Sequence, residues 1–411
     1  MGRMLFLAGY AGDAGDAGDA GDAGDAGDSG RSASKRGSRS QIFASDGVRG
    51  RWDNSGYEPP NFATGPEALD NWGLKERLLT LEAEMLSGLH YDQPTADGSG
   101  ICVRYHDIAK SQSESLVHMI RPDTRTFVQQ LAFVQNYAPL RLERNEEIVA
   151  QVDNILNYFT SVLPLYPLRH DNARQVIQIC LNVTRLVQQR VKHALACRRP
   201  AEYAPQIQPS IQTPAHSALP SGHATESFVV AFVFYELFRQ AHTLIVNGSP
   251  VPLVEAENLA PKELLQNLQT VRTQLLRHAE RIAINRTVAG VHFPIDSAAG
   301  MILGQTLAEY YLQRFGVPVP GFCRTFHGSR FQGDFVYKDL LPDSGGTGPT
   351  ETPSVEQSGD KFAAAKSPLL EYLWHKAQKE LAIEIELPGG QALTNALKSS
   401  QSGNASPEAG T

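Results

Sequence analysis

The chain has 411 residues, of which 41% are apolar and 20% charged, a composition that is ordinary for one large soluble domain or two smaller ones. Its formal net charge is −7, but six of the aspartates lie in one N-terminal repeat, so the rest of the chain is close to neutral. This balance argues against a nucleic-acid partner and against a polybasic membrane-binding surface.

The N-terminal region is repetitive. Residues 11–28 are six copies of Ala-Gly-Asp, which bury too little apolar surface to fold, so we expect residues 1–40 to form a disordered tail. The preceding stretch "MGRMLFLAGYAGD" is too short in apolar residues for a secretory signal. The longest apolar run, "FVVAFVF", has seven residues, well below the roughly 18 that a membrane span needs. We therefore expect a soluble, cytoplasmic protein with no membrane association.

Between about residues 60 and 335 the dominant hydrophobic period is helical. Helices are expected at 75–89, 147–163, 172–196, 223–241 and 263–284, and another starts at Pro294, a residue well suited to a first helical position. One continuous apolar stripe marks the 172–196 helix: Val176, Ile179, Cys180, Val183, Leu186, Val187 and Val191. No alternating segment of strand length is evident. The expected fold class is all-α, a helical bundle that forms one catalytic domain over residues 41–335.

The C-terminal region, residues 336–411, is rich in Gly, Ser, Pro and Thr. We expect a linker, one helix within "PLLEYLWHKAQKELAIEIEL" and a disordered tail. The four cysteines lie far apart in the sequence and show no metal-ligand spacing, so they are expected to be reduced or buried thiols.

The segment "KHALACRRP" places two cations near the end of the 172–196 helix. Lys192 lies in its last turn, and Pro200 disfavours helical geometry at Arg199. Cations at the C-terminal end of a helix often only interact with the helix dipole while remaining in solvent. This is the plainer interpretation of the segment when it is taken alone.

The segment "PSGH" opens the 223–241 helix. Ser221 is a candidate N-cap, and Gly222 allows the backbone to approach a ligand closely. His223 lies in the first turn, where the dipole disfavours a protonated imidazole unless an anion lies opposite. The turn is therefore either a simple cap or half of an anion-binding site.

The segment "NRTVAGVHFPIDSAAG" contains Arg286, His292 and Asp296. His292 and Asp296 are four residues apart, so the carboxylate can accept from one imidazole nitrogen and leave the other exposed. A histidine held in this way serves as a nucleophile or a metal ligand, although a local His–Asp bond in a capped helix is equally compatible with the spacing.

The three segments together point to a bound oxyanion. Lys192, Arg199 and Arg286 within about 4 Å of one point would repel by about 4 kcal/mol per pair at an effective dielectric of 20. A multiply charged oxyanion would make such a site favourable.

In this order, K-x6-R-P, PSGH and R-x5-H-x3-D resemble the signature shared by type 2 phosphatidic acid phosphatases and vanadium-dependent haloperoxidases. The resemblance covers residues 192–296 and implies a helical bundle that holds phosphate or vanadate. It implies that five residues bind the oxyanion: Lys192, Arg199, Arg286, Ser221 and Gly222. It also implies that His292 is the axial vanadium ligand or the phosphorus nucleophile, and that Asp296 orients this histidine. His223 is implied to be the acid–base residue. Asn285 departs from the pattern, because many members have serine there.

Two branches of this superfamily are compatible with these residues. The length and helical character resemble a haloperoxidase, which implies vanadate as cofactor and hydrogen peroxide with bromide or iodide as substrates. His216 stands where bromo- and iodoperoxidase-type members carry a second histidine, although a surface loop histidine is the alternative. Gln189 falls where some haloperoxidases place a tryptophan. The same residues suit an acid phosphatase acting on a phosphomonoester through a phosphohistidine, and a non-catalytic oxyanion-binding protein is a third hypothesis. A homo-oligomer is compatible with all three.

Overall fold

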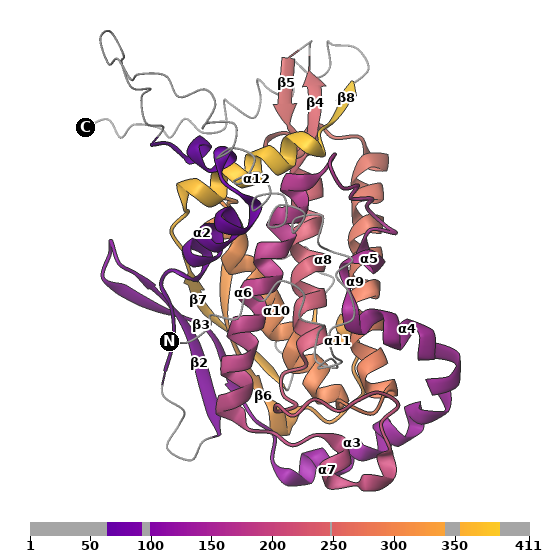
Figure 1. Cartoon of the computed structure of the whole chain (residues 1–411). Helices are drawn as coiled ribbons and strands as arrows, with labels where there is room; N and C mark the ends of the chain where they lie inside the picture. Colours follow the sequence, from indigo (N-terminus) through magenta and orange to yellow (C-terminus); the bar gives the residue numbers. More distant parts are fainter. Residues whose placement is uncertain (1–63, 93–98, 247–248, 342–353, 387–411) are drawn as a thin grey trace, which may run out of the picture.

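The computed structural model describes residues 64–92, 99–246, 249–341 and 354–386. Four long helices form its centre: α6 (Asp171–Leu195), α8 (Gly222–Gln240), α9 (Lys262–Val288) and α10 (Pro294–Arg314) (Figure 1). All four agree closely with the helices expected from the hydrophobic period. The expected Ala-Gly-Asp tail and the C-terminal tail lie outside the described residues.

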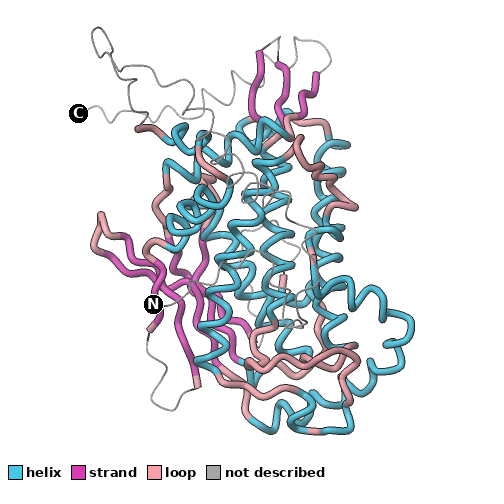
Figure 2. Tube along the Cα trace, in the orientation of Figure 1, coloured by secondary structure: helices cyan, strands magenta, loops and turns pink. Residues whose placement is uncertain are grey.

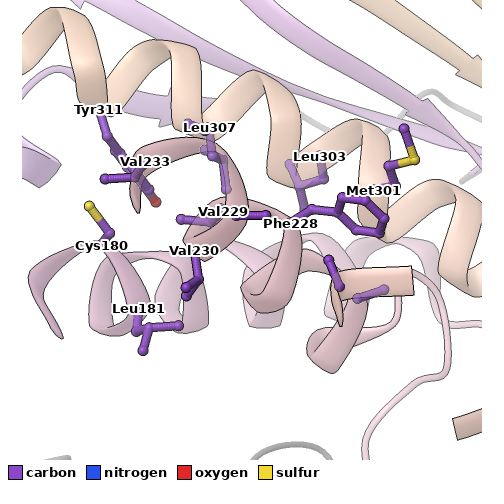
Figure 3. Close-up of a cluster of buried hydrophobic side chains, with 14 of the residues drawn as sticks. Cys180, Leu181, Phe228, Val229, Val230, Val233, Met301, Leu303, Leu307 and Tyr311 are labelled. Carbon is purple, nitrogen blue, oxygen red and sulfur yellow. The ribbon is translucent and has the colours of Figure 1, made fainter. Parts of the chain in front are cut away.

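Helix α8 lies within the bundle and packs against α6, α9 and α10. Its sequence is apolar on nearly every side, which is typical of a helix with no solvent face. Figure 3 shows Phe228, Val229, Val230 and Val233 of α8 between Cys180 and Leu181 of α6 and Met301, Leu303, Leu307 and Tyr311 of α10. Of the stripe predicted on α6, Leu186 alone is exposed, and the other six residues are buried.

Helices α8 and α10 approach each other closely. A Cβ atom added at Gly300 would lie 2.7 Å from the carbonyl oxygen of Ser221 and 2.8 Å from Cβ of Ala224. One at Gly304 would lie 2.6 Å from the carbonyl oxygen of Thr225. The two glycines of α10 therefore allow its backbone to contact the first turns of α8 directly.

The fold is mostly helical, as expected, but it is not all-α, because the structure also contains two sheets (Figure 2). The larger sheet has the order β1-β2-β3-β6-β7, in which β3 and β6 are parallel and the other pairs antiparallel. Its strands are β1 (Leu89–Tyr91), β2 (Gly100–Asp107), β3 (Gln112–Ile120), β6 (Gly321–His327) and β7 (Val355–Phe362). The smaller sheet has the order β5-β4-β8, with β4 (His242–Val246), β5 (Ser249–Pro252) and β8 (Ile383–Glu386).

The larger sheet covers one side of the bundle, where α10 contacts β6 and β3. In β2 the alternate residues Ile101, Val103 and Tyr105 are buried, whereas the residues between them are partly exposed. This period of two indicates a strand with one face on the core.

The shorter helices flank the bundle: α2 (Leu74–Leu86), α3 (Thr124–Tyr137), α4 (Arg141–Asp153), α5 (Leu156–Phe159), α7 (Pro200–Tyr203), α11 (Tyr337–Leu340) and α12 (Pro368–Glu380). The helix expected over 147–163 is two helices, because Asn154 adopts an extended backbone and its side chain accepts from the amide of Leu156. Near the C-terminus, α12 is the expected helix and packs on α6, while β7 pairs with β6.

Candidate active site

The predicted site residues gather at one end of the bundle, near α3, α4 and α7 (Figure 1). Lys192 and Arg286 lie in the last turns of α6 and α9, which is favourable for cations. Ser221 precedes α8, and Asp296 lies in the first turn of α10. Most of the set is inaccessible to solvent: Lys192, Arg199 and His223 are 1% exposed, and Ser221, Arg286, His292 and Asp296 are 0% exposed.

His292 and Asp296 form the predicted pair. Nδ1 of His292 lies 3.0 Å from Oδ2 of Asp296, and the same oxygen accepts from the amide of Phe293 at 2.9 Å. Because an ionised carboxylate only accepts, Nδ1 carries the proton and Nε2 carries the lone pair. Nε2 lies 3.0 Å from NH1 of Arg199, so the nitrogen available for chemistry faces a guanidinium.

Arg199 and Lys192 are held by the loop that precedes α8. Nε of Arg199 donates to the carbonyl oxygen of His216 at 3.1 Å, and NH1 donates to that of Val291 at 3.0 Å. Nζ of Lys192 donates to the carbonyl oxygens of Ser217 and Ala218 at 3.1 and 3.2 Å. This loop therefore brings the two cations of the "KHALACRRP" segment to the same place.

His216 lies beside the cations and is partly exposed, in contrast to the fully buried histidines of the site. Its Nδ1 is 3.2 Å from NH2 of Arg199. A simple surface histidine would lack this contact with a buried guanidinium.

Ser221 is the N-cap of α8, because its Oγ accepts from the amide of Ala224 at 3.4 Å. Its own amide donates to the carbonyl oxygen of Asp296 at 2.9 Å, which ties the start of α8 to the start of α10. The buried Gly222 and His223 follow directly. The structure thus has the cap that the plainer interpretation of "PSGH" predicts, and it brings two helix N-termini together.

Arg286 and His223 meet at a residue that the sequence analysis missed, Gln151 of α4. NH2 of Arg286 donates to Oε1 of Gln151 at 3.0 Å and to the carbonyl oxygen of Ile148 at 3.0 Å. Nε2 of His223 lies 3.1 Å from the carbonyl oxygen of Gln151. Since a carbonyl oxygen only accepts, Nε2 of His223 carries a proton, and Nδ1 is the nitrogen that can exchange one when the ring is neutral.

Asn285, the residue that departs from the family pattern, also contacts Gln151. Its Nδ2 donates to Oε1 of Gln151 at 3.0 Å, and its Oδ1 accepts from NH1 of Arg144 at 3.2 Å. One sequence signal for Gln151 does exist. It lies three residues after the buried Ile148, and a polar residue on the apolar face of a helix calls for a buried partner.

The site therefore consists of two adjoining hydrogen-bonded groups. The first contains Lys192, Arg199, His216, Ser221, His292 and Asp296, and the second contains Arg286, His223, Asn285 and Gln151. Consecutive residues Ser221, Gly222 and His223 join them. Val291 also joins the two groups. Its amide donates to the carbonyl oxygen of Arg286, and its carbonyl oxygen accepts from Arg199.

A cysteine lies within this end of the bundle but has little reactivity. Cys197, between Lys192 and Arg199 in the sequence, is 6% exposed, and burial raises the pKa of its thiol to about 12. Its thiol therefore stays protonated at neutral pH and is a poor nucleophile. All four cysteines of the chain are free thiols.

The family model of the PAP2 superfamily matches residues 176–316, from the first part of α6 to the end of α10. This segment of the chain belongs to the PAP2 superfamily. This superfamily includes both haloperoxidases and phosphatases. The PAP2 region contains all nine predicted site residues, whereas Gln151 precedes it. No curated protein matches this chain. Within the described residues, no helix has the length and apolar character needed to cross a membrane.

Proposed function

We propose that this protein is a vanadate-dependent haloperoxidase that oxidises bromide or iodide with hydrogen peroxide. One observation carries the proposal: three cations, Lys192, Arg199 and Arg286, are buried at the same end of the bundle. Arg199 faces Nε2 of His292, the nitrogen that the bond to Asp296 leaves unprotonated. Three buried cations repel one another, and a multiply charged oxyanion between them would offset that repulsion.

The donors at the site fit vanadate. Guanidinium groups, an ammonium group and the N-terminus of α8 are the groups that bind tetrahedral oxyanions. The Nε2 lone pair of His292 suits a bond to vanadium, because Asp296 holds the ring in that tautomer. Lys192, Arg199, Arg286, Ser221 and Gly222 would hold the oxygens.

When bound, vanadate supplies Lewis-acid activation of peroxide. The remaining contributions come from the chain. Arg199 and Lys192, fixed by the 216–218 carbonyls, stabilise negative charge at a water-excluded site. His223 exchanges protons with the peroxide at Nδ1, because Nε2 is held by the Gln151 carbonyl.

His216 supports the peroxidase branch over the phosphatase branch. The haloperoxidase resemblance implies a second histidine near the oxyanion, and His216 contacts Arg199 at 3.2 Å while remaining partly accessible. A small anion such as bromide could reach the cationic cluster beside this side chain.

An acid phosphatase is the second candidate, favoured by the same His292–Asp296 pair and by Gln189. Gln189 is exposed and does not form an aromatic halide pocket. In this reaction, Nε2 of His292 attacks phosphorus, and the bond to the leaving oxygen breaks as His223 protonates that oxygen. Water then hydrolyses the phosphohistidine.

The deciding experiment uses the purified full chain. Bromide and iodide oxidation by peroxide is measured before and after loading with orthovanadate, and phosphomonoester hydrolysis is measured without it. Halide oxidation that depends on vanadate supports the first function. Phosphate release that vanadate inhibits supports the second. Oxyanion binding without either activity indicates a non-catalytic binding protein.

A further inference from the structure

Gln151 is a fully buried polar residue that contacts three residues at the edge of the proposed oxyanion site. It is 0% exposed and lies in α4, outside the segment that matches the PAP2 superfamily. Its Oε1 accepts from Arg286 and Asn285, each at 3.0 Å, and its backbone carbonyl is 3.1 Å from Nε2 of His223.

The orientation of the Gln151 amide is determined by Glu147, one helical turn earlier. Nε2 of Gln151 donates to Oε1 of Glu147 at 3.0 Å. Burial would raise the pKa of Glu147, but its hydrogen bonds and ion pair with Arg281 outweigh burial and lower that pKa. The carboxylate is thus ionised and accepts only, so Oε1 of Gln151 must face the opposite way, toward Arg286.

Arg286 is consequently anchored to α4 through its NH2 nitrogen. NH2 donates both to Oε1 of Gln151 and to the Ile148 carbonyl, and these two acceptors fix the plane of the guanidinium. A guanidinium recognises an oxyanion through a planar fork, so its plane matters to the geometry of binding. The neighbouring backbone carbonyl of Gln151 fixes the ring of His223 in the same turn.

We infer that Gln151 is a positioning residue for the oxyanion site: its side-chain amide orients Arg286, and its backbone carbonyl orients His223. This inference rests on the proposed function, because it assigns Gln151 a role in the same site. In this role Gln151 acts through Arg286.

The test is a binding measurement on the full chain. The dissociation constant of orthovanadate is determined by titration calorimetry for the wild type, Gln151→Met, Arg286→Met and the double variant. Methionine preserves the length of the side chain and removes its acceptor. We expect Gln151→Met to raise the dissociation constant about tenfold, the loss expected for one charge-assisted contact. In the Arg286→Met background the same change should have little further effect.

The chain offers a matched control at Gln240 of α8, at the opposite end of that helix from His223. Its Nε2 donates to Glu236, which precedes it by four residues and is paired with Arg239, and its Oε1 accepts from Trp374. Gln240→Met therefore removes the same kind of hydrogen bonds away from the site. We expect it to leave orthovanadate affinity unchanged.

Each outcome decides between these ideas. The positioning role is overturned if Gln151→Met binds orthovanadate with a dissociation constant within about twofold of wild type. It is also overturned if the losses of binding free energy in Gln151→Met and Arg286→Met add fully in the double variant. Both results leave the proposed function intact. A wild type that does not bind orthovanadate overturns both. Should Gln151→Met not fold, Gln151→Asn replaces it. Its amide is one methylene shorter and cannot reach Arg286, so unchanged affinity in that variant also contradicts the inference.

Discussion

Two imidazole rings at this site are each held at one nitrogen, and the partner determines which nitrogen remains for chemistry. The Asp296 carboxylate accepts a hydrogen bond from Nδ1 of His292, and the Gln151 carbonyl accepts one from Nε2 of His223. The two histidines therefore present opposite nitrogens. In the proposed function, the first would offer a lone pair to phosphorus or vanadium, and the second would exchange protons.

His292→Ala should reduce either enzymatic activity to background, because no other side chain supplies the Nε2 lone pair at that position. Asp296→Asn should cost about 10- to 100-fold in activity, as is usual when the partner of a ligating histidine is changed. Steady-state assays with bromide or with a phosphomonoester check both. Substantial turnover by His292→Ala would remove this histidine from the mechanism.

Arg286→Ala should weaken orthovanadate binding by about 1.5–3 kcal/mol for each charge-assisted hydrogen bond lost. Arg277→Ala is a suitable control, since Arg277 also lies in α9 but is exposed. Its effect on orthovanadate binding should be much smaller. Equal affinities of wild type and Arg286→Ala, measured by calorimetry, would contradict the proposed role.

The eight candidate site residues within the three motifs could be singled out from the sequence, because the spacing within each motif is short and local. Gln151 could not, since it lies in a separate helix and reaches Arg286 through tertiary packing alone. No spacing rule links it to the three motifs. The same applies to the 216–218 carbonyls, whose backbone oxygens hold Lys192 and Arg199 whatever side chains they carry.

At the scale of elements, the contact between α8 and α10 sets the position of the site. Gly300 allows α10 to lie against the carbonyl oxygen of Ser221, and the Ser221 amide in turn donates to Asp296. The N-termini of the two helices are thereby held together, with His223 on one and Asp296 on the other. A change in their separation would alter both histidine environments.

Gly300→Ala should destabilise the protein by about 1–3 kcal/mol, because the new methyl group meets backbone and an alanine Cβ that cannot rotate away. Alanine favours the helix over glycine by about 1 kcal/mol. The measured loss of unfolding free energy is therefore smaller than the energy of the steric clash itself. Chemical denaturation measures the effect. Gly359→Ala is the control, since nothing lies within 4 Å of its added Cβ, and an equally large loss there would refute the packing argument.

The helices were predictable because each has a long apolar face, as α6 does. The strands were harder to recognise. In β2 the buried Ile101, Val103 and Tyr105 alternate with cysteine, arginine and histidine, so the signal extends over only a few residues. In β7 only the two end residues, Val355 and Phe362, are buried, and the interior of the strand carries no apolar pattern to detect.

For the whole molecule, three partly or fully buried histidines link stability to pH. Burial lowers the pKa of His118, His242 and His278 below the usual value of 6.5. The unfolded chain therefore gains protons first as the pH falls. The contribution of these neutral histidines to the free energy of unfolding is fully present above about pH 6.5, the pKa of histidine in the unfolded chain. It is lost as the pH decreases through the lower pKa values of the folded protein.

The thermal unfolding midpoint should accordingly fall between pH 7 and pH 5. His242→Gln should make that fall smaller, because glutamine can replace the donor to the Phe238 carbonyl without titrating. The exposed His375 supplies the comparison, and His375→Gln should leave the pH dependence as it is in the wild type. Calorimetric scans across this range, in buffers of equal ionic strength, measure all three proteins. Identical profiles for wild type and His242→Gln would exclude His242 from the effect.

The parallel pair β3–β6 joins residues 117–120 to residues 324–327, with the whole PAP2 segment between them in the sequence. During synthesis on the ribosome, the hairpin of β2 and β3 emerges first and has an open edge until β6 arrives more than two hundred residues later. β6 in turn exposes its own edge until β7 has been translated. A nascent chain of this protein thus carries an open strand edge for most of its elongation, and such an edge favours pairing with other chains until its own partner strand has been made.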